Sequence, residues 1–293
     1  MGPITVSSQQ RLPKPTPPRT GHYHHSSIRE SNFIVNSTRK TSIATGTLLI
    51  LATIAVLTAT ALEPALTGTD YLTGVANHPH RLATAALLHL IAAGSSVGIA
   101  LALYPLLKKV NAALALGSVV FRTIEAVFYT AAVVNLLSIL TLGQQLATAP
   151  ADNRAPIQAI ADSLLSIRDH STLAAVLAFI LGALMYYTLF YRSRLVPRWL
   201  SGWGAAAALL MLTACLLALF SNSPVTGYTF LILPIAVQEL VMAVWLLVRG
   251  FSPVVQVRFT GLSKGDIRHA EEHIRSPKPV MIATVESTDP GRR

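Results

Sequence analysis

Six long apolar stretches constrain this chain more than any other feature of its sequence. A transmembrane helix needs about 20 mostly apolar residues to cross about 30 Å of hydrocarbon, because its backbone must satisfy its polar groups internally. Each of the six stretches meets that length. The sequence therefore predicts an all-α, polytopic membrane protein with six transmembrane helices in a bundle. The predicted spans are residues 43–62, 82–104, 114–142, 171–191, 199–220 and 228–248.

The composition supports this class and divides the chain into three parts. Hydrophobic residues make up 52% of the 293 residues and charged residues only 12%, against about 25% charged in an ordinary soluble domain. The charges concentrate outside the apolar middle. We expect a disordered basic cytoplasmic tail over residues 1–41, which is too polar to fold alone. The transmembrane domain then covers residues 42–250, and a mostly flexible cytoplasmic tail covers residues 251–293.

The positions of lysine and arginine predict the orientation in the membrane. These residues are enriched in cytoplasmic loops. They gather in both tails and in the second and fourth loops, whereas the opposite side carries only Arg81, Arg154 and Arg168. An even number of spans puts both termini on one side of the membrane. Both termini are therefore expected in the cytoplasm, where the basic tails meet anionic lipid headgroups of the bilayer.

The third loop contains a further helical pattern. Apolar residues recur at helical spacing between Pro156 and Arg168, which predicts a short amphipathic helix lying on the outer membrane surface. The apolar face of this helix consists of Ile157, Ile160, Ala161, Leu164 and Leu165. A second such helix around residues 266–274 is the alternative to a solvated C-terminal tail.

Four ionisable residues lie inside the predicted spans, where a charge costs several kcal/mol and needs a partner. They are His89, Arg122, Glu125 and Glu239. Arg122 and Glu125 are three residues apart on one helix face, so they can pair. At 1.5 Å per residue, Arg122 and Glu239 lie roughly 12 and 16 Å from the start of their spans. Matching depths therefore predict Arg122 beside Glu239 near the midplane, with Glu125 beside His89 one turn further out.

One arginine cannot neutralise two carboxylates. The second carboxylate must pair with a protonated His89, stay protonated or bind a cation. These residues are therefore interpreted as a ligand or proton site inside the bundle. The alternative is a buried ion-pair network that fixes the register of the helices. The residues expected to line a polar cavity beside them, or to form single hydrogen bonds between helices, are Tyr129, Gln238 and His170.

No motif indicates a metal, a cofactor or a catalytic residue, and none is predicted. The chain lacks a phosphate-binding loop, a His-Glu-x-x-His motif and a Gly-x-Ser-x-Gly motif. Its single cysteine, Cys215, excludes an intramolecular disulfide. The net charge of +10 comes without a nucleic-acid-binding signature, so no nucleic-acid partner is expected. Gly94 and Gly98 form a small-residue pair that packs helices within the bundle or, alternatively, joins copies in a homo-oligomer.

Four short motifs together resemble the bacterial membrane family catalogued as domain of unknown function 4386. They are residues 104–111 closing the second span, 121–126 in the third, 191–194 with 197–198 after the fourth, and 239–240 with 245–250 closing the sixth. The resemblance covers residues 44–251. It implies a multi-span protein of the plasma membrane and carries no established activity.

Three functions are consistent with these residues. The first is a small-molecule or proton-linked carrier or binding protein, in which Arg122 clamps an anionic group and Glu239 or Glu125 exchanges a proton. The second is a non-catalytic membrane partner or scaffold in which the charged cluster is structural. The third is a membrane-embedded enzyme that acts on a lipid or terpenoid with Glu125 or Glu239 as an acid, although no nucleophile, metal or oxyanion site accompanies it.

Overall fold

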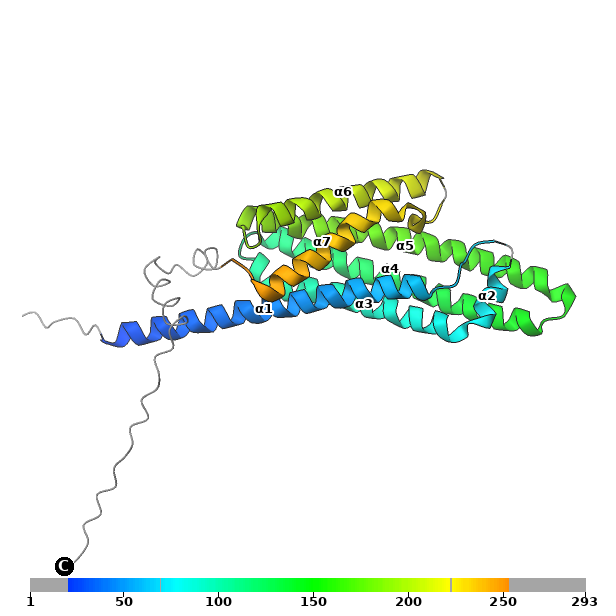
Figure 1. The fold of residues 1–293 in the computed structure, drawn as a ribbon, viewed down its shortest axis with the longest axis horizontal. Coiled ribbons are helices and arrows are strands. Elements are labelled where there is room, and N and C mark those ends of the chain that lie inside the picture. Colours follow the sequence, from blue (N-terminus) through cyan, green and yellow to red (C-terminus); the bar gives the residue numbers. More distant parts are fainter. Residues whose placement is uncertain (1–20, 69, 222, 253–293) are drawn as a thin grey trace, which may run out of the picture. The chain divides into compact units, whose positions relative to one another are not determined.

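The computed structural model describes residues 21–68, 70–221 and 223–252, with side chains from residue 38 onward. This part of the chain contains seven α-helices, one 3-10 helix and no strand (Figure 1). The elements are α1 (Gly21–Leu62), α2 (Tyr71–Asn77), α3 (Pro79–Leu107), α4 (Ala112–Thr148), α5 (Ala151–Ser193), α6 (Arg198–Ser221), η1 (Val225–Tyr228) and α7 (Thr229–Val248). The all-α prediction is therefore confirmed.

Six of these helices are long and apolar enough to cross a membrane, as predicted. The spans are Thr38–Leu62, Pro79–Leu107, Ala112–Thr148, Ala151–Ser193, Arg198–Ser221 and Val225–Val248. Each contains one of the predicted spans and extends beyond it at one or both ends. Most of the extensions carry polar residues. A helix can continue through them, although their hydropathy is too low for a segment that lies in hydrocarbon.

Residues 21–41 were expected to be disordered tail, but in the structure they are the first part of α1. A helix that is already nucleated by an apolar span elongates at low cost, because each further residue adds a hydrogen bond. The chain divides into two compact units, residues 1–34 with 265–293 and residues 35–264. In the first unit the structure describes the helical residues 21–34. The candidate helix at residues 266–274 lies outside the described residues.

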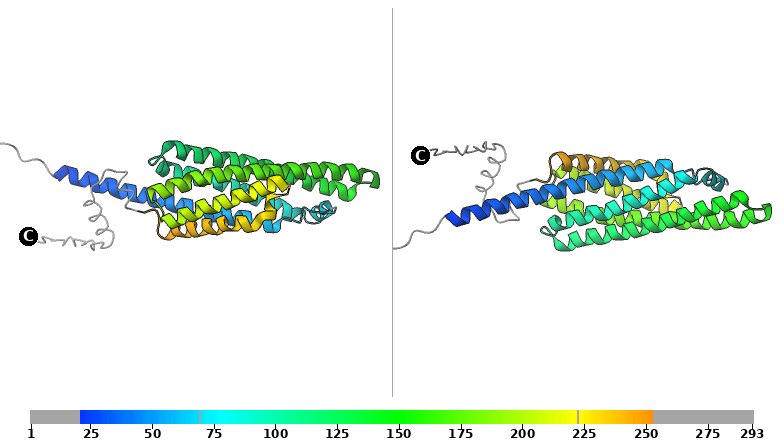
Figure 2. Two further views of the ribbon diagram at one scale, coloured as in Figure 1. Left: turned by 90° about the horizontal axis from the view of Figure 1, so that it is seen from above. Right: turned by 90° about the horizontal axis from the view of Figure 1, so that it is seen from below.

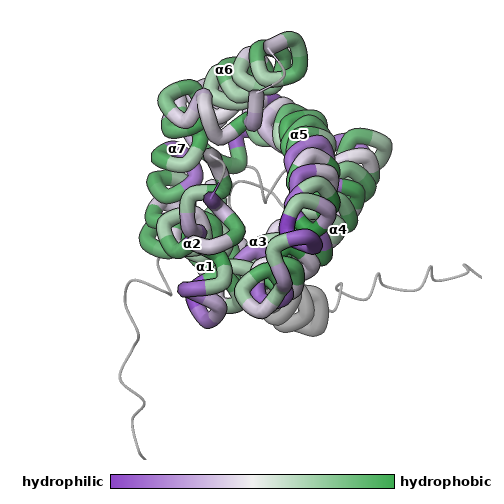
Figure 3. The backbone as a smooth tube through the Cα atoms, turned by 90° about the vertical axis from the view of Figure 1, so that its right-hand side faces the viewer, coloured by the Kyte–Doolittle hydropathy of each residue, from purple (hydrophilic) through white to green (hydrophobic). Residues whose placement is uncertain are grey.

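In the second unit the six long helices form a closed ring. Neighbours in the order α3, α4, α5, α6, α7 pack against one another. The ring closes through α1, where Gly98 of α3 faces Leu48 and Gly46 faces Leu247 of α7. Views perpendicular to the bundle and along it show this arrangement (Figures 2 and 3). Large apolar side chains such as Phe220 and Val248 are exposed on the outside, as expected of a surface that faces lipid.

The two ends of the ring differ, and we name them by their elements. The α2 end holds α2, the α4–α5 connection and η1, and the turn end holds the α3–α4 and α5–α6 turns and the end of α7. At 1.5 Å per residue α4 and α5 are about 55 and 65 Å long, roughly twice the hydrocarbon thickness. Both therefore extend past the other helices at the α2 end (Figure 1).

The predicted surface helix in the third loop is wrong. Residues 156–168 belong to the single long helix α5. Their apolar face, which includes Ala161 and Leu164, packs with Tyr71 and Leu72 of α2 and Leu136 of α4. Contact with α2 and α4 covers Ile157, Ala161, Leu164 and Leu165 of the predicted apolar face, whereas Ile160 stays exposed. The amphipathic pattern was correct, but it could not show which partner covers it.

Candidate functional site

Arg122 and Glu125 form a buried ion pair on one face of α4. Arg122 Nη1 lies 3.1 Å from Glu125 Oε2, and the two residues are only 2% and 4% exposed. The spacing of three residues brings both side chains to the same helix face. The predicted pairing of these two residues is therefore confirmed.

Side chains from α3 and α5 complete the surroundings of Arg122. Ser96 Oγ accepts a hydrogen bond from Arg122 Nη1 at 2.9 Å and donates one to Glu125 Oε2 at 2.8 Å. Arg122 Nη2 donates to the hydroxyl of Tyr186 at 3.1 Å. The guanidinium lies over the ring of Phe179, 4.3 Å from its centroid. Arg122 is thus held by a carboxylate, two hydroxyls and an aromatic face.

Glu239 reaches the same cluster from α7, but its contacts are weaker. Its Oε1 lies 3.9 Å from Arg122 Nη2, which is within reach of charge attraction and beyond a hydrogen bond. Its Oε2 accepts a hydrogen bond from Thr53 of α1 at 3.3 Å. The side chain of Glu239 is 13% exposed, against 5% for Glu125. The predicted Arg122–Glu239 pair exists, and Glu239 is its loosely held member.

The hydrogen-bond donors of Arg122 are not all used. Its buried Nε–H has no hydrogen-bond partner in the part of the chain that the structure describes. Nη2 makes one hydrogen bond, to Tyr186, and its second N–H faces the more distant Glu239. A buried guanidinium with two donors left over is unusual, since buried donors are nearly always paired.

A second buried network joins α5, α6 and α7 beside this cluster. The hydroxyl of Tyr187 donates to the side-chain carbonyl of Gln238, and Gln238 Nε2 donates to the backbone carbonyl of Leu200 at 3.1 Å. Gly204 of α6 makes room for Tyr187, because a Cβ there would lie 2.2 Å from the ring. Gln238 is 0% exposed. Its amide therefore forms hydrogen bonds between helices, the alternative expected for these polar residues.

The predicted pairing of His89 with Glu125 is wrong. His89 Nε2 lies 2.7 Å from Glu63 Oε1, just after the end of α1. Glu63 Oε2 also accepts a hydrogen bond from Arg168 of α5 at 2.6 Å, and Arg168 pairs with Asp169 at 3.3 Å. Similar depth did not bring Glu125 and His89 together, because Glu125 is already bound by Arg122 and Ser96 on the inner face of the ring.

Glu63 was missed in the sequence reasoning, although its position carried a signal. It is an acidic residue directly after the first apolar stretch, near the depth of His89 on the next span. Burial by itself would raise the pKa of the Glu63 carboxyl. Hydrogen bonds and charge from His89 and Arg168 outweigh burial and lower that pKa below its ordinary value. Glu63 is therefore held as a carboxylate that ties α1 to α3 and α5.

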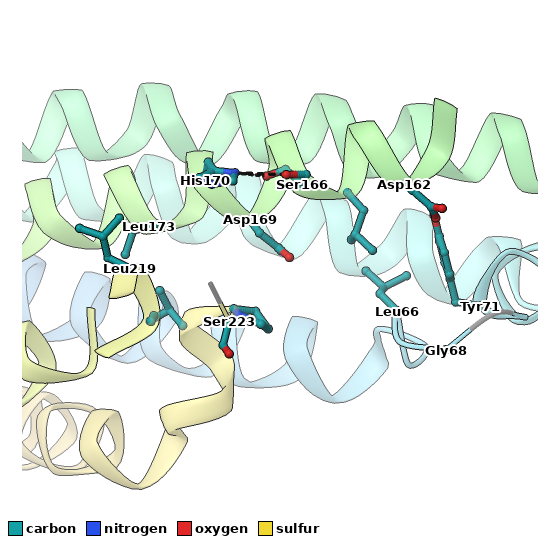
Figure 4. A pocket seen from close by; sticks show the side chains of 14 residues that line it. Leu66, Gly68, Tyr71, Asp162, Ser166, Asp169, His170, Leu173, Leu219 and Ser223 are labelled. Atoms are coloured by element: carbon teal, nitrogen blue, oxygen red, sulfur yellow. Dashed lines mark hydrogen bonds between the residues drawn. The ribbon is translucent and has the colours of Figure 1, made fainter. Parts of the chain in front are cut away.

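A cleft of about 350 Å³ opens at the α2 end (Figure 4). His170 lines it, and its Nδ1 lies 2.7 Å from the backbone carbonyl of Ser166. Asp169 lines the cleft as well, and Tyr71 donates a hydrogen bond to Asp162 at 2.9 Å. Burial, and then Asp162, raise the pKa of Tyr71. His170 therefore lies at a cavity, whereas Tyr129 is half-buried and packs against the apolar cluster between α5 and α6.

Within the described residues, no three His, Cys, Asp or Glu side chains are grouped as a metal site requires. The structure thus brings three of the four predicted intramembrane residues together, on α4 and α7, and places the fourth in a separate network with Glu63.

A family model for a domain of unknown function, DUF4386, matches residues 44–250. No curated protein and no solved structure was found to match the chain.

Proposed function

The chain belongs to the family described as domain of unknown function DUF4386, and from its buried charges we propose that it is a proton-linked carrier or binding protein for small organic anions. The observation that carries this proposal is the inequality of the two interior carboxylates. Glu125 has two hydrogen bonds from buried groups, whereas Glu239 has one, from Thr53.

The charge balance of the cluster supports a bound proton at Glu239. One guanidinium faces two carboxylates, and its close contact is with Glu125. An uncompensated charge inside a membrane costs several kcal/mol, so the second carboxylate binds a proton or another cation. The side chain of Glu239 is 13% exposed, against 2% for Arg122 and 5% for Glu125, and we expect its proton to exchange on that side.

The unused donors of Arg122 supply the anion site. When Glu239 is protonated, its attraction for the guanidinium disappears. Arg122 Nη2 and Nε are then available to a carboxylate or another anionic group of a substrate. Glu239 and the substrate thus compete for Arg122, and binding of the anion is linked to uptake of a proton.

Uptake into proteoliposomes tests the proposal, with radiolabelled acetate, lactate, succinate and benzoate as probes, each counted above its uptake into protein-free liposomes, because neutral weak acids enter an alkaline lumen without a carrier. We expect an alkaline lumen to drive accumulation of at least one probe, and Glu239→Gln to abolish it. Asp152→Asn is the control, because it removes an exposed carboxylate outside the interior cluster. Uptake that is insensitive to Glu239→Gln would contradict the carrier function.

A titration without any substrate provides a second test. Between about pH 9 and about pH 5, wild type should bind about one proton more than Glu239→Gln. Carboxylates with an ordinary pKa near 4 stay ionised over that interval, so the additional proton is the one that we assign to Glu239. An equal proton uptake by both proteins would contradict the proposed proton site at Glu239.

The enclosure of the Arg122–Glu125 pair favours a second candidate, a non-catalytic membrane partner. Four buried groups on three helices, namely Arg122, Glu125, Ser96 and Tyr186, form hydrogen bonds with one another. Such a network fixes the register of helices without binding anything. In that case Arg122 and Glu239 substitutions change stability and leave no ligand-dependent signal.

A further inference from the structure

A pocket of about 470 Å³ lies at the turn end, between the α5–α6 turn and the residues that follow α7. It is separate from the Arg122 cluster and from the cleft at the α2 end. The lining residues include Arg194, Leu195, Arg198, Trp245, Arg249 and Phe251.

Among the described residues, the charged side chains that line this pocket are all positive. They are Arg194, Arg198 and Arg249, and no acidic residue of the described part of the chain lines the pocket. The five ion pairs in the described part of the chain involve none of these three arginines. Three guanidinium groups near one cavity repel one another, so the arrangement is stabilised when an anion binds there.

Aromatic rings orient two of the arginines. The guanidinium of Arg198 lies 5.3 Å from the centroid of the Tyr191 ring, and that of Arg249 lies 5.3 Å from the Trp245 ring. Contact with a ring face leaves the N–H groups at the edge of the guanidinium free to donate. The two side chains are thus held without their donors being used.

The backbone of the pocket is tied together from both walls. Gly250, at φ +73°, turns the chain after α7, and its N–H donates to the carbonyl of Trp245 at 3.2 Å. The N–H of Ser252 donates to the carbonyl of Leu195 at 2.8 Å. Phe251 and Leu195 are buried and line the same pocket as the arginines. The pocket therefore combines buried apolar side chains with exposed positive charge.

Tryptophan side chains place this pocket at the depth of lipid headgroups. Trp199 lies 6.4 Å from both Trp203 and Trp245, measured between ring centroids, and it is 55% exposed. Tryptophan is enriched at the boundary between hydrocarbon and headgroups. Exposed apolar surface next to the pocket favours an anion that carries acyl chains, which is a lipid headgroup, over a dissolved solute.

We propose that this pocket binds the phosphate of an anionic phospholipid. The planar guanidinium donates two parallel hydrogen bonds to phosphate oxygens, which an ammonium group cannot do. Basic pockets at the ends of transmembrane helices are the general kind of site that binds such headgroups. This proposal does not depend on the carrier function, because no residue of the Arg122 cluster takes part.

The tryptophan fluorescence of the chain can be used to measure lipid binding at this pocket. Its three tryptophans all lie at this end of the bundle, so quenching of their fluorescence by brominated lipids reports lipids bound there. The full-length protein in detergent is titrated with brominated phosphatidylglycerol and brominated phosphatidylcholine at about 1 M salt, where the Debye length is about 3 Å and general surface attraction is screened. We expect the anionic lipid to bind more tightly.

Charge-matched double variants test the residues. Arg198→Gln with Arg249→Gln should weaken phosphatidylglycerol binding by roughly tenfold for each arginine, the loss expected when one direct hydrogen bond to a charged group is removed. Arg194→Gln with Arg198→Gln should do the same. The control is Arg192→Gln with Lys108→Gln, which removes two exposed basic residues that do not line the pocket. It should change binding by less than about twofold, because the attraction of an exposed charge is screened at this salt concentration.

Three results would overturn the proposal. One is a wild type that binds both lipids equally. Another is an equal loss in the pocket variants and in the control, which would indicate attraction by general surface charge. The third is relief of phosphatidylglycerol quenching by an excess of inorganic phosphate, because the pocket would then bind a dissolved anion instead of a lipid.

Discussion

Glu239 lies 3.9 Å from Arg122, while Glu125 lies 3.1 Å from the same guanidinium. Glu125 therefore forms a hydrogen-bonded ion pair with Arg122, whereas Glu239 is attracted by the charge of Arg122 without a hydrogen bond to it. The two carboxylates come from different helices, α4 and α7, so their unequal distances depend on how the ring closes. The predictions on the cluster follow from this inequality.

Breaking the Arg122–Glu125 pair should cost far more stability than neutralising Glu239. Arg122→Gln leaves Glu125 buried without its cation, a change that typically costs about 3–5 kcal/mol. Glu239→Gln removes a carboxylate without a close cation, and we expect it to be neutral or stabilising, within about 1 kcal/mol. The measurement is thermal unfolding of the purified protein in detergent.

Double variants of Arg122 with Glu125 and of Arg122 with Glu239 measure the two interactions separately. The coupling energy between Arg122 and Glu125 should exceed about 1 kcal/mol, and that between Arg122 and Glu239 should be smaller. A large stability loss in Glu239→Gln, with strong coupling to Arg122, would favour the structural partner over the proton-linked carrier.

Acid should destabilise the protein through Glu63. Its pKa is lowered in the folded state because His89 and Arg168 outweigh the effect of burial. Such a group contributes stability at pH values above its unfolded pKa and loses that contribution as the pH falls through its folded pKa. The unfolding midpoint of wild type should therefore fall as the pH drops below about 4.3, the ordinary glutamate value.

Two variants isolate that contribution. Glu63→Gln should lower the midpoint at neutral pH and flatten the decline in acid. Asp152→Asn, which removes an exposed acid at the start of α5, should decline as wild type does. Parallel curves for wild type and Glu63→Gln would show that the Glu63 network contributes nothing to the pH dependence.

Two glycines on α6 provide a matched test of helix packing. A Cβ at Gly204 would lie 2.2 Å from the ring of Tyr187, whereas nothing lies within 4 Å of a Cβ at Gly202. Gly204→Ala should therefore cost about 1–3 kcal/mol through overpacking and displace Tyr187 from Gln238. Gly202→Ala should be neutral or stabilise by up to about 1 kcal/mol, because alanine favours a helix. Equal unfolding midpoints for the two variants would contradict this packing.

The sequence predicted those features that depend on neighbours along the chain. The six spans follow from local hydropathy, and the Arg122–Glu125 pair follows from a spacing of three residues on one helix. The contact between Glu63, His89 and Arg168 depends on the rotation of three helices about their own axes, which depth alone does not determine. The order of helices around the ring is likewise set by packing between distant segments, so the contribution of Thr53 and Ser96 to the cluster was not visible.

Arg122→Lys distinguishes the two functions of the cluster most directly. A register pair needs a positive charge near Glu125, and lysine supplies it as a point charge. An anion clamp needs the planar fork of arginine, whose donors reach Ser96, Glu125 and Tyr186 together and leave two N–H groups for a substrate. If Arg122 serves as the clamp, Arg122→Lys should be more stable than Arg122→Gln and still fail to accumulate any anion in proteoliposomes. Full uptake by the lysine variant would show that only the charge of Arg122 matters, and the assignment of its free donors to a substrate would be wrong.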